Sequence, residues 1–261
     1  MGFSWAGSLN GAGAPTVMNM FTGETTYVGQ LLEYDVSGAN GGHVIPANAA
    51  SEADEDDQLI IGVCAGIVDG SRTHVAASSG AAQYGDRTTY TITQATIAAT
   101  GVSEVEVIVN VPMVTLWRAP LYNAAWGTAL PVMSNTAASS GGVTITDAAN
   151  LVVDAADNFS TIYCRSGANR GHYRVVTAGT STSVRTCVVP FPYAIAVGDT
   201  FVQASLVKGY SHMSIPATAD CIDGNNDVNT WYDIFVQTLN LEEAGKEYAV
   251  FSFWHNQHAH T

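Results

Sequence analysis

The chain has 261 residues, of which 47% are hydrophobic and only 12% are charged, and its formal net charge is −14. The apolar fraction excludes a disordered chain, and the negative charge excludes nucleic acid as a favoured partner because an acidic surface repels phosphate. No apolar run is long enough for a membrane helix, and Met1-Gly2-Phe3-Ser4-Trp5 lacks the features of a signal peptide. We therefore expect that the protein is made in the cytoplasm and does not associate with a membrane.

Residues 1–26 are rich in Gly, Ala, Ser, Thr and Asn, and their few large side chains follow neither a helical nor a strand period. Such a segment is typical of an extended arm that becomes ordered against a partner, with its large apolar side chains as anchors. The sequence therefore predicts an extended N-terminal arm. Its expected partner-binding residues are Phe3, Trp5, Met18, Met20 and Phe21.

Residues 27–111 alternate between short apolar runs and turn residues. A glycine-rich loop at 38–42 and an acidic run at 51–57 separate these runs. β-Branched residues in short runs between such breaks indicate strands. We expect a small β-barrel-like domain here, with a turn followed by a strand at 28–35 and further strands at 43–46, 59–68, 88–97 and 102–111.

Residues 112–140 are rich in Pro, Asn, Ala and aromatic residues, which is typical of a connector. Residues 141–261 again read as short strands with turns between them. This spacing predicts a second β-rich domain, a sandwich or a barrel, so the whole chain is expected to be all-β. Its predicted strands lie at 143–146, 161–165, 172–177, 182–189, 199–207, 229–239 and 247–254.

Three segments of the first predicted domain suggest a family. The segments are Gly29-Gln30-Leu31-Leu32-Glu33-Tyr34, Val44-Ile45-Pro46-Ala47 and Ile61-Gly62-Val63-Cys64-Ala65-Gly66. Their order resembles that of the head decoration (capsid cement) proteins of tailed phages. The Val-rich strand expected next in that family corresponds to 102–111, and segments 162–174, 191–201 and 239–248 are similar to phage virion proteins. The resemblance implies a bacteriophage virion protein on the capsid surface that binds the major capsid protein. Because the second domain is an addition to that family's pattern, a head protrusion and a tail component are alternative roles.

Motifs for catalysis are absent from the sequence. It contains no Gly-x-Ser-x-Gly elbow and no His-Glu-x-x-His motif, and Gly11-Ala12-Gly13 lacks the strand and helix that a phosphate-binding loop needs. The four cysteines (Cys64, Cys164, Cys187 and Cys221) form no CxxC pair, so we expect buried thiols, with a Cys164–Cys187 disulfide as the alternative. We expect no enzyme activity and no cofactor.

Two segments have the residue types of a metal site. His255, His258 and His260 place three imidazoles within six residues, which suits Zn²⁺ or Ni²⁺, although a polar tail lying on a neighbouring subunit explains them too. Residues 220–227 are rich in oxygen ligands but lack the spacing of an EF-hand, so either a calcium loop or a β-turn accounts for them.

The aromatic residues allow a second kind of function. Aromatic rings stack on sugars, and in a β protein they also serve as core or interface residues. The candidates are Trp117, Trp126, Trp231, Tyr232 and Trp254.

Low charge, the apolar-studded arm and the family resemblance together favour a non-enzymatic decoration protein. It would bind the outer capsid surface and stabilise the head through subunit contacts, as a trimer or another symmetric homo-oligomer. The alternative hypothesis is an adhesin or glycan-binding protein on a tail or on the head surface.

Overall fold

The computed structural model describes residues 2–11, 13–22, 24, 26–34, 43–47, 60–68, 91–92, 104–122, 130–147, 160–176, 183–213, 215, 221–223 and 232–254. These ranges form nineteen strands and no helix, which confirms the predicted all-β class. Within them there is accordingly no helix with the length and apolar character needed to cross a membrane.

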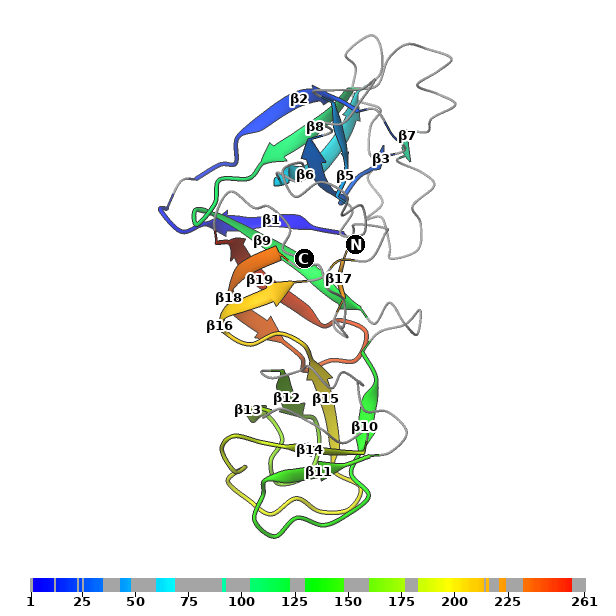
Figure 1. Cartoon of the computed structure of the whole chain (residues 1–261), viewed down its shortest axis with the longest axis vertical. Helices are drawn as coiled ribbons and strands as arrows, with labels where there is room; N and C mark the ends of the chain where they lie inside the picture. The colour runs from blue at the N-terminus through cyan, green and yellow to red at the C-terminus, as the bar shows by residue number, and fades with distance from the viewer. Residues whose placement is uncertain are drawn as a thin grey trace.

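The strands are stacked along the long axis as an upper, a middle and a lower unit (Figure 1). The upper unit is a sheet of order β2-β8-β6-β4-β5, beside which β3 pairs with β7. All these pairs are antiparallel. The strands are β2 (Val17–Phe21), β3 (Thr26–Tyr27), β4 (Leu31–Tyr34), β5 (Val44–Pro46), β6 (Ile60–Val68), β7 (Thr91–Ile92) and β8 (Glu104–Val109).

The middle unit is a sheet of order β1-β9-β19-β18-β16. Strand β17 pairs in parallel with the C-terminal end of β9. It brings together segments from the beginning, the middle and the end of the chain. The strands are β1 (Ser4–Ser8), β9 (Thr115–Tyr122), β16 (Gly209–Met213), β17 (Ile222–Asp223), β18 (Tyr232–Asn240) and β19 (Tyr248–Phe253).

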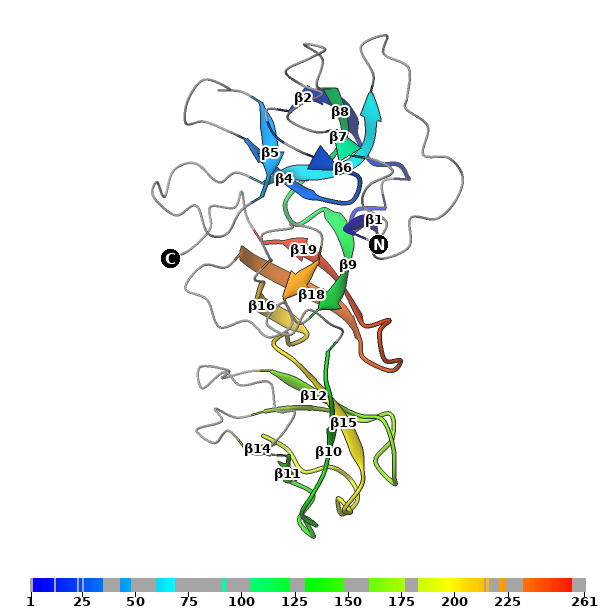
Figure 2. The ribbon, with the colours of Figure 1, turned by 90° about the vertical axis from the view of Figure 1, so that its right-hand side faces the viewer.

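The lower unit consists of a sheet of order β10-β15-β12-β13 and a separate pair of strands, β11 and β14. The view in Figure 2 shows the same order of upper, middle and lower units after a quarter turn. The strands are β10 (Val132–Ser134), β11 (Thr144–Thr146), β12 (Thr161–Cys164), β13 (Tyr173–Val175), β14 (Val184–Thr186) and β15 (Thr200–Ala204).

Strand β4 of the upper unit and strand β15 of the lower unit are buried on both faces. Successive residues of a strand point to opposite faces, and in β4 Leu31 joins the central apolar cluster while Leu32 joins the cluster of the upper unit. In β15 Val202 likewise joins the central cluster and Phe201 the lower one. The central cluster therefore contains side chains from all three units, which are packed into one body.

The structure differs from the predicted domain organisation at the N-terminus. The segment predicted as an extended arm supplies β1, which pairs with β9, and β2, which pairs with β8. The segment predicted as a connector supplies β9, which lies inside the middle sheet between β1 and β19. None of the described sheets closes into a barrel, so open sheets stand where the sequence predicted barrel-like packing.

Candidate partner-binding surface

The predicted anchor residues belong to different environments. Phe3 is only 3% exposed and packs edge-on against Phe251, with the ring centroids 6.2 Å apart. Trp5 is half-buried against the central cluster and lies opposite Trp117 in the β1–β9 pair. These two side chains hold the N-terminal segment to the middle sheet. They correct the prediction, because Phe3 is not accessible to a partner.

Strand β2 places the other three anchors on an edge of the upper sheet. Met20 points inward and packs on the apolar cluster of the upper unit. Met18 and Phe21 are 49% and 53% exposed, and their neighbour Val17 is exposed to a similar extent. An edge strand with large apolar side chains in solvent is typical of a surface that pairs with another chain.

Exposed apolar side chains continue from β2 onto the two neighbouring turns. Backbone hydrogen bonds hold these turns together, from Leu9 N to Val114 O (2.8 Å) and from Val109 N to Thr16 O (2.9 Å). Figure 1 shows both connections on the same side of the molecule as β2. We call this surface the upper flank; its residues are Leu9, Val17, Met18, Phe21, Val111 and Met113.

Met113 has an unusual backbone conformation for its residue type. Its φ of 59° lies in the left-handed region, which costs about 1 kcal/mol or more for a residue other than glycine. The turn is held by hydrogen bonds from Met113 N to Phe253 O and from Val114 N to Val111 O. Strain of this kind persists where the surroundings fix it, and here it presents a methionine side chain on the upper flank.

Charges near the upper flank are acidic. In the pairing of β2 with β8, Glu106 lies opposite Asn19 and Glu104 lies opposite Phe21. Neither strand contains a lysine or an arginine. On the face of β2 that carries Val17 and Phe21, acidic side chains of β8 therefore lie directly beside the apolar ones, which suits a neutral or basic partner surface.

A second exposed apolar surface lies in the lower unit. The loop after β14 presents Val188, Val189, Tyr193 and Val197, each more than half exposed. Asn169 is fully buried beneath this loop. Its side-chain amide donates to Tyr193 O, and its side-chain oxygen accepts from Tyr193 N, both at 3.0 Å. We call this surface the lower end; Val132 and Val175 on the same unit are exposed as well.

Sequence reasoning missed the lower end because its apolar residues lie in a predicted strand and in the loop that follows. The run Val188-Val189-Pro190-Phe191-Pro192-Tyr193 contains two prolines, which cannot donate to a strand ladder. An apolar run interrupted in this way points to an ordered loop rather than to a central strand. Only Phe191 of this run is buried, where it packs against Phe201 at 5.7 Å between centroids.

The groups with catalytic or metal-binding chemistry do not converge in the described ranges. No group of three or more His, Cys, Asp or Glu side chains with metal-site geometry occurs there. The four cysteines are free and buried, as expected, and burial raises the pKa of Cys64 and Cys187 to about 12 and that of Cys164 to about 11. Thiols of this kind are poor nucleophiles. The candidate ligands His255, His258 and His260 lie outside the described residues, as does most of 220–227.

The aromatic candidates are also distributed. Trp117 and Tyr232 are fully buried, so they are core residues and no sugar can reach them. Trp126 and Trp231 lie outside the described residues. Trp254 follows β19 and is half-buried, with Phe235 and Tyr210 as ring neighbours.

Comparison with known proteins gives no assignment. No protein-family model, no curated protein and no solved structure matches this chain.

Proposed function

We propose that the protein is a non-enzymatic structural component of a tailed-phage particle, a decoration or cement protein that binds the outer surface of the major capsid protein. The observation that carries the proposal is the position of the exposed large apolar side chains. Among the described residues they lie on the upper flank and at the lower end, with Tyr210 alone on the middle sheet. A protein with two separate adhesive surfaces is suited to bridging subunits.

Burial of these side chains supplies the adhesion energy. A large apolar side chain transferred from water into an interface contributes about 1.5–3 kcal/mol, and a few such residues dominate a typical interface. Phe21 and Met18 are the largest exposed side chains on β2. A protein that binds only the assembled shell stabilises that shell by mass action. This is how the upper flank would stabilise a filled head without any catalytic step.

The lower end is the surface proposed for contacts between copies. Its apolar side chains are carried by an ordered loop, so little conformational entropy is lost when they are buried. Closed symmetric oligomers are the usual outcome when identical chains associate, and a trimer is the form proposed here. The resemblance of residues 29–66 to phage cement proteins supports the same assignment.

Shell binding by point variants tests the proposal. Removing residues 1–26 would take away β1, β2 and the buried Phe3, so a loss of binding would report only misfolding. We therefore choose Phe21→Glu, which places a charge on the exposed face of β2. Sedimentation with assembled shells of the cognate capsid protein is expected to show an affinity at least about ten-fold lower, because a charge in an apolar interface costs at least about 1.4 kcal/mol.

Gln237→Glu is the matched control, since it adds the same charge at an exposed position of β18 in the middle sheet. This variant should bind shells like the unmodified protein. Unchanged binding of Phe21→Glu, or an equal loss in both variants, contradicts a role for the upper flank. Turnover of any substrate by the purified protein contradicts the non-enzymatic assignment.

A further inference from the structure

The outer face of the middle sheet carries a group of aromatic and polar side chains. In the antiparallel pair β16–β18, Tyr210 lies opposite Phe235, and His212 lies opposite Asp233. Their strand neighbours Ser211, Met213 and Ile234 are buried, so the alternation of the strands directs the group away from the core. Trp254 joins it from the end of β19, where its backbone N donates to Asp233 O.

The rings of this group form a corner. Trp254 is roughly parallel to Phe235, with an interplanar angle of 27° and centroids 6.1 Å apart. Tyr210 stands nearly perpendicular to Trp254, at 80° and 5.8 Å, and is also perpendicular to His212. Two ring surfaces that meet at about a right angle can contact a flat, apolar face and its edge at the same time.

A carboxylate organises the polar side of the corner. Tyr210 Oη donates to Asp233 Oδ1 at 2.8 Å, and His212 Nδ1 lies 2.9 Å from the same oxygen. Partial burial, and then the Asp233 carboxylate, raise the pKa of Tyr210, so its phenol stays protonated at neutral pH. With its proton directed to Asp233, the Tyr210 oxygen presents its lone pairs as acceptors.

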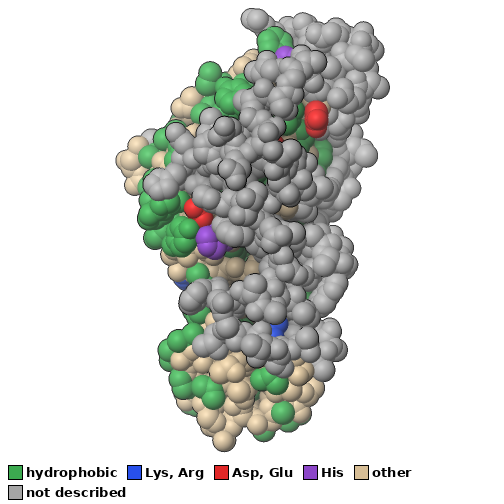
Figure 3. Space-filling model, in the orientation of Figure 1, with side chains coloured by type: hydrophobic (Ala, Val, Ile, Leu, Met, Phe, Trp, Pro, Cys, Tyr) green, Lys and Arg blue, Asp and Glu red, His purple; other side chains and the backbone are tan. Residues whose placement is uncertain are grey.

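Two side chains of the group are exposed, whereas Phe235 and Trp254 are half-buried and the Asp233 side chain is 14% exposed. Tyr210 is 49% exposed and the His212 side chain is 46% exposed. Figure 3 shows a histidine and an acidic side chain next to hydrophobic side chains halfway along the molecule. The group lies on the middle sheet, apart from the residues that define the upper flank and the lower end.

We propose that Tyr210, His212, Asp233, Phe235 and Trp254, together the aromatic platform, bind an uncharged carbohydrate. The C–H face of a hexopyranose ring is flat and apolar and packs on aromatic rings, while its hydroxyl groups donate to and accept from polar side chains at the rim. The net charge of −14 and the Asp233 carboxylate disfavour sialylated or sulfated sugars, which leaves neutral hexose glycans as the class that fits.

The test uses the full-length protein and no shells, so its outcome is independent of the proposed function. A glycan array containing neutral hexose and anionic oligosaccharides identifies the ligand, and calorimetric titration with that oligosaccharide gives its Kd. Tyr210→Ala should weaken binding about ten-fold, which corresponds to the loss of one ring contact and one polar contact. Tyr210→Phe keeps the ring and should lose about three-fold, the share of a single hydrogen bond.

Lys246→Ala is the control, because the Lys246 side chain is mostly exposed in the middle unit and lies outside the platform, the upper flank and the lower end. Its affinity for the oligosaccharide should be unchanged. The proposal is overturned if no neutral glycan binds at millimolar concentration, if anionic glycans bind more tightly, or if Tyr210→Ala and Lys246→Ala behave alike.

Discussion

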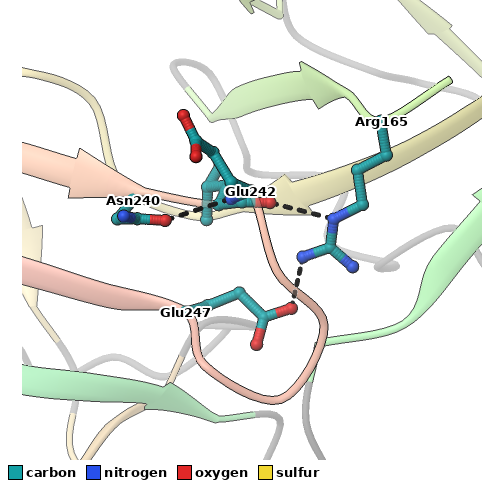
Figure 4. Close-up of polar contacts among 5 residues, drawn as sticks. Arg165, Asn240, Glu242 and Glu247 are labelled. Atoms are coloured by element: carbon teal, nitrogen blue, oxygen red, sulfur yellow. Dashed lines mark hydrogen bonds and ion pairs between the residues drawn. The ribbon is translucent and has the colours of Figure 1, made fainter. Parts of the chain in front are cut away.

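A buried ion pair connects the lower unit to the middle unit. Arg165 follows β12, and Glu247 precedes β19; Arg165 Nη2 lies 2.5 Å from Glu247 Oε1 (Figure 4). Arg165 Nε also donates to Leu241 O at 2.9 Å. The side chains are 9% and 0% exposed, and Arg165 Nη1 and Glu247 Oε2 have no hydrogen-bond partner in the described part of the chain. Each charge therefore depends mainly on the other for compensation.

Glu247→Gln should lower the free energy of unfolding by about 3–5 kcal/mol, because it leaves the buried Arg165 charge uncompensated. Glu243→Gln is the control in the same loop. It removes an ion pair with Lys246 in which both side chains are mostly exposed, and it should cost less than about 1 kcal/mol. Urea unfolding measures both. Combining Arg165→Met with Glu247→Leu should recover part of the loss, and a double variant as unstable as Glu247→Gln would disprove the charge argument.

The local sequence pattern was sufficient to predict a strand where the strand itself is rich in apolar residues. The prediction at 59–68 matches β6, and the prediction at 247–254 matches β19. The pattern failed for β1, because Ser4-Trp5-Ala6-Gly7-Ser8 has little strand propensity, and for β2, because Val17-Met18-Asn19-Met20-Phe21 shows no alternation of apolar and polar residues. They are strands because β9 and β8, about a hundred residues away, supply their hydrogen bonds. Pairing at such a distance leaves no local pattern in the sequence.

Strand β6 has a position where only glycine fits. A Cβ added at Gly62 would lie 1.9 Å from the backbone oxygen of Ile108 on β8, so the strand itself would have to move. Gly62→Ala should therefore destabilise the protein by about 1–3 kcal/mol, as overpacking does in a core. Gly13→Ala, where a Cβ meets nothing within 4 Å, should change the free energy of unfolding by less than about 0.5 kcal/mol. Equal urea midpoints for the two variants would show that β8 adapts without cost.

For the molecule as a whole, composition and strand content gave the all-β class but not the number of folding units. The boundary predicted at 111–112 separates β8 from β9, yet the chain returns to the middle sheet with β16, β18 and β19 after it has built the lower unit. The same limit applies to the surfaces. Met18 and Phe21 were predictable as exposed anchors, whereas the aromatic platform joins Tyr210, Phe235 and Trp254, which become neighbours only through strand pairing.

The shared central cluster predicts how the molecule unfolds. Leu31 of the upper unit, Trp117 of the middle unit and Val202 of the lower unit belong to the same buried cluster. Melting one unit would expose the apolar faces of its neighbours, at about 25 cal/mol for each Å² uncovered, so partly unfolded states are disfavoured. Differential scanning calorimetry should show one transition whose van't Hoff and calorimetric enthalpies agree. Two resolved transitions, with one of them shifted alone by Glu247→Gln, would mean that the lower unit folds independently of the rest.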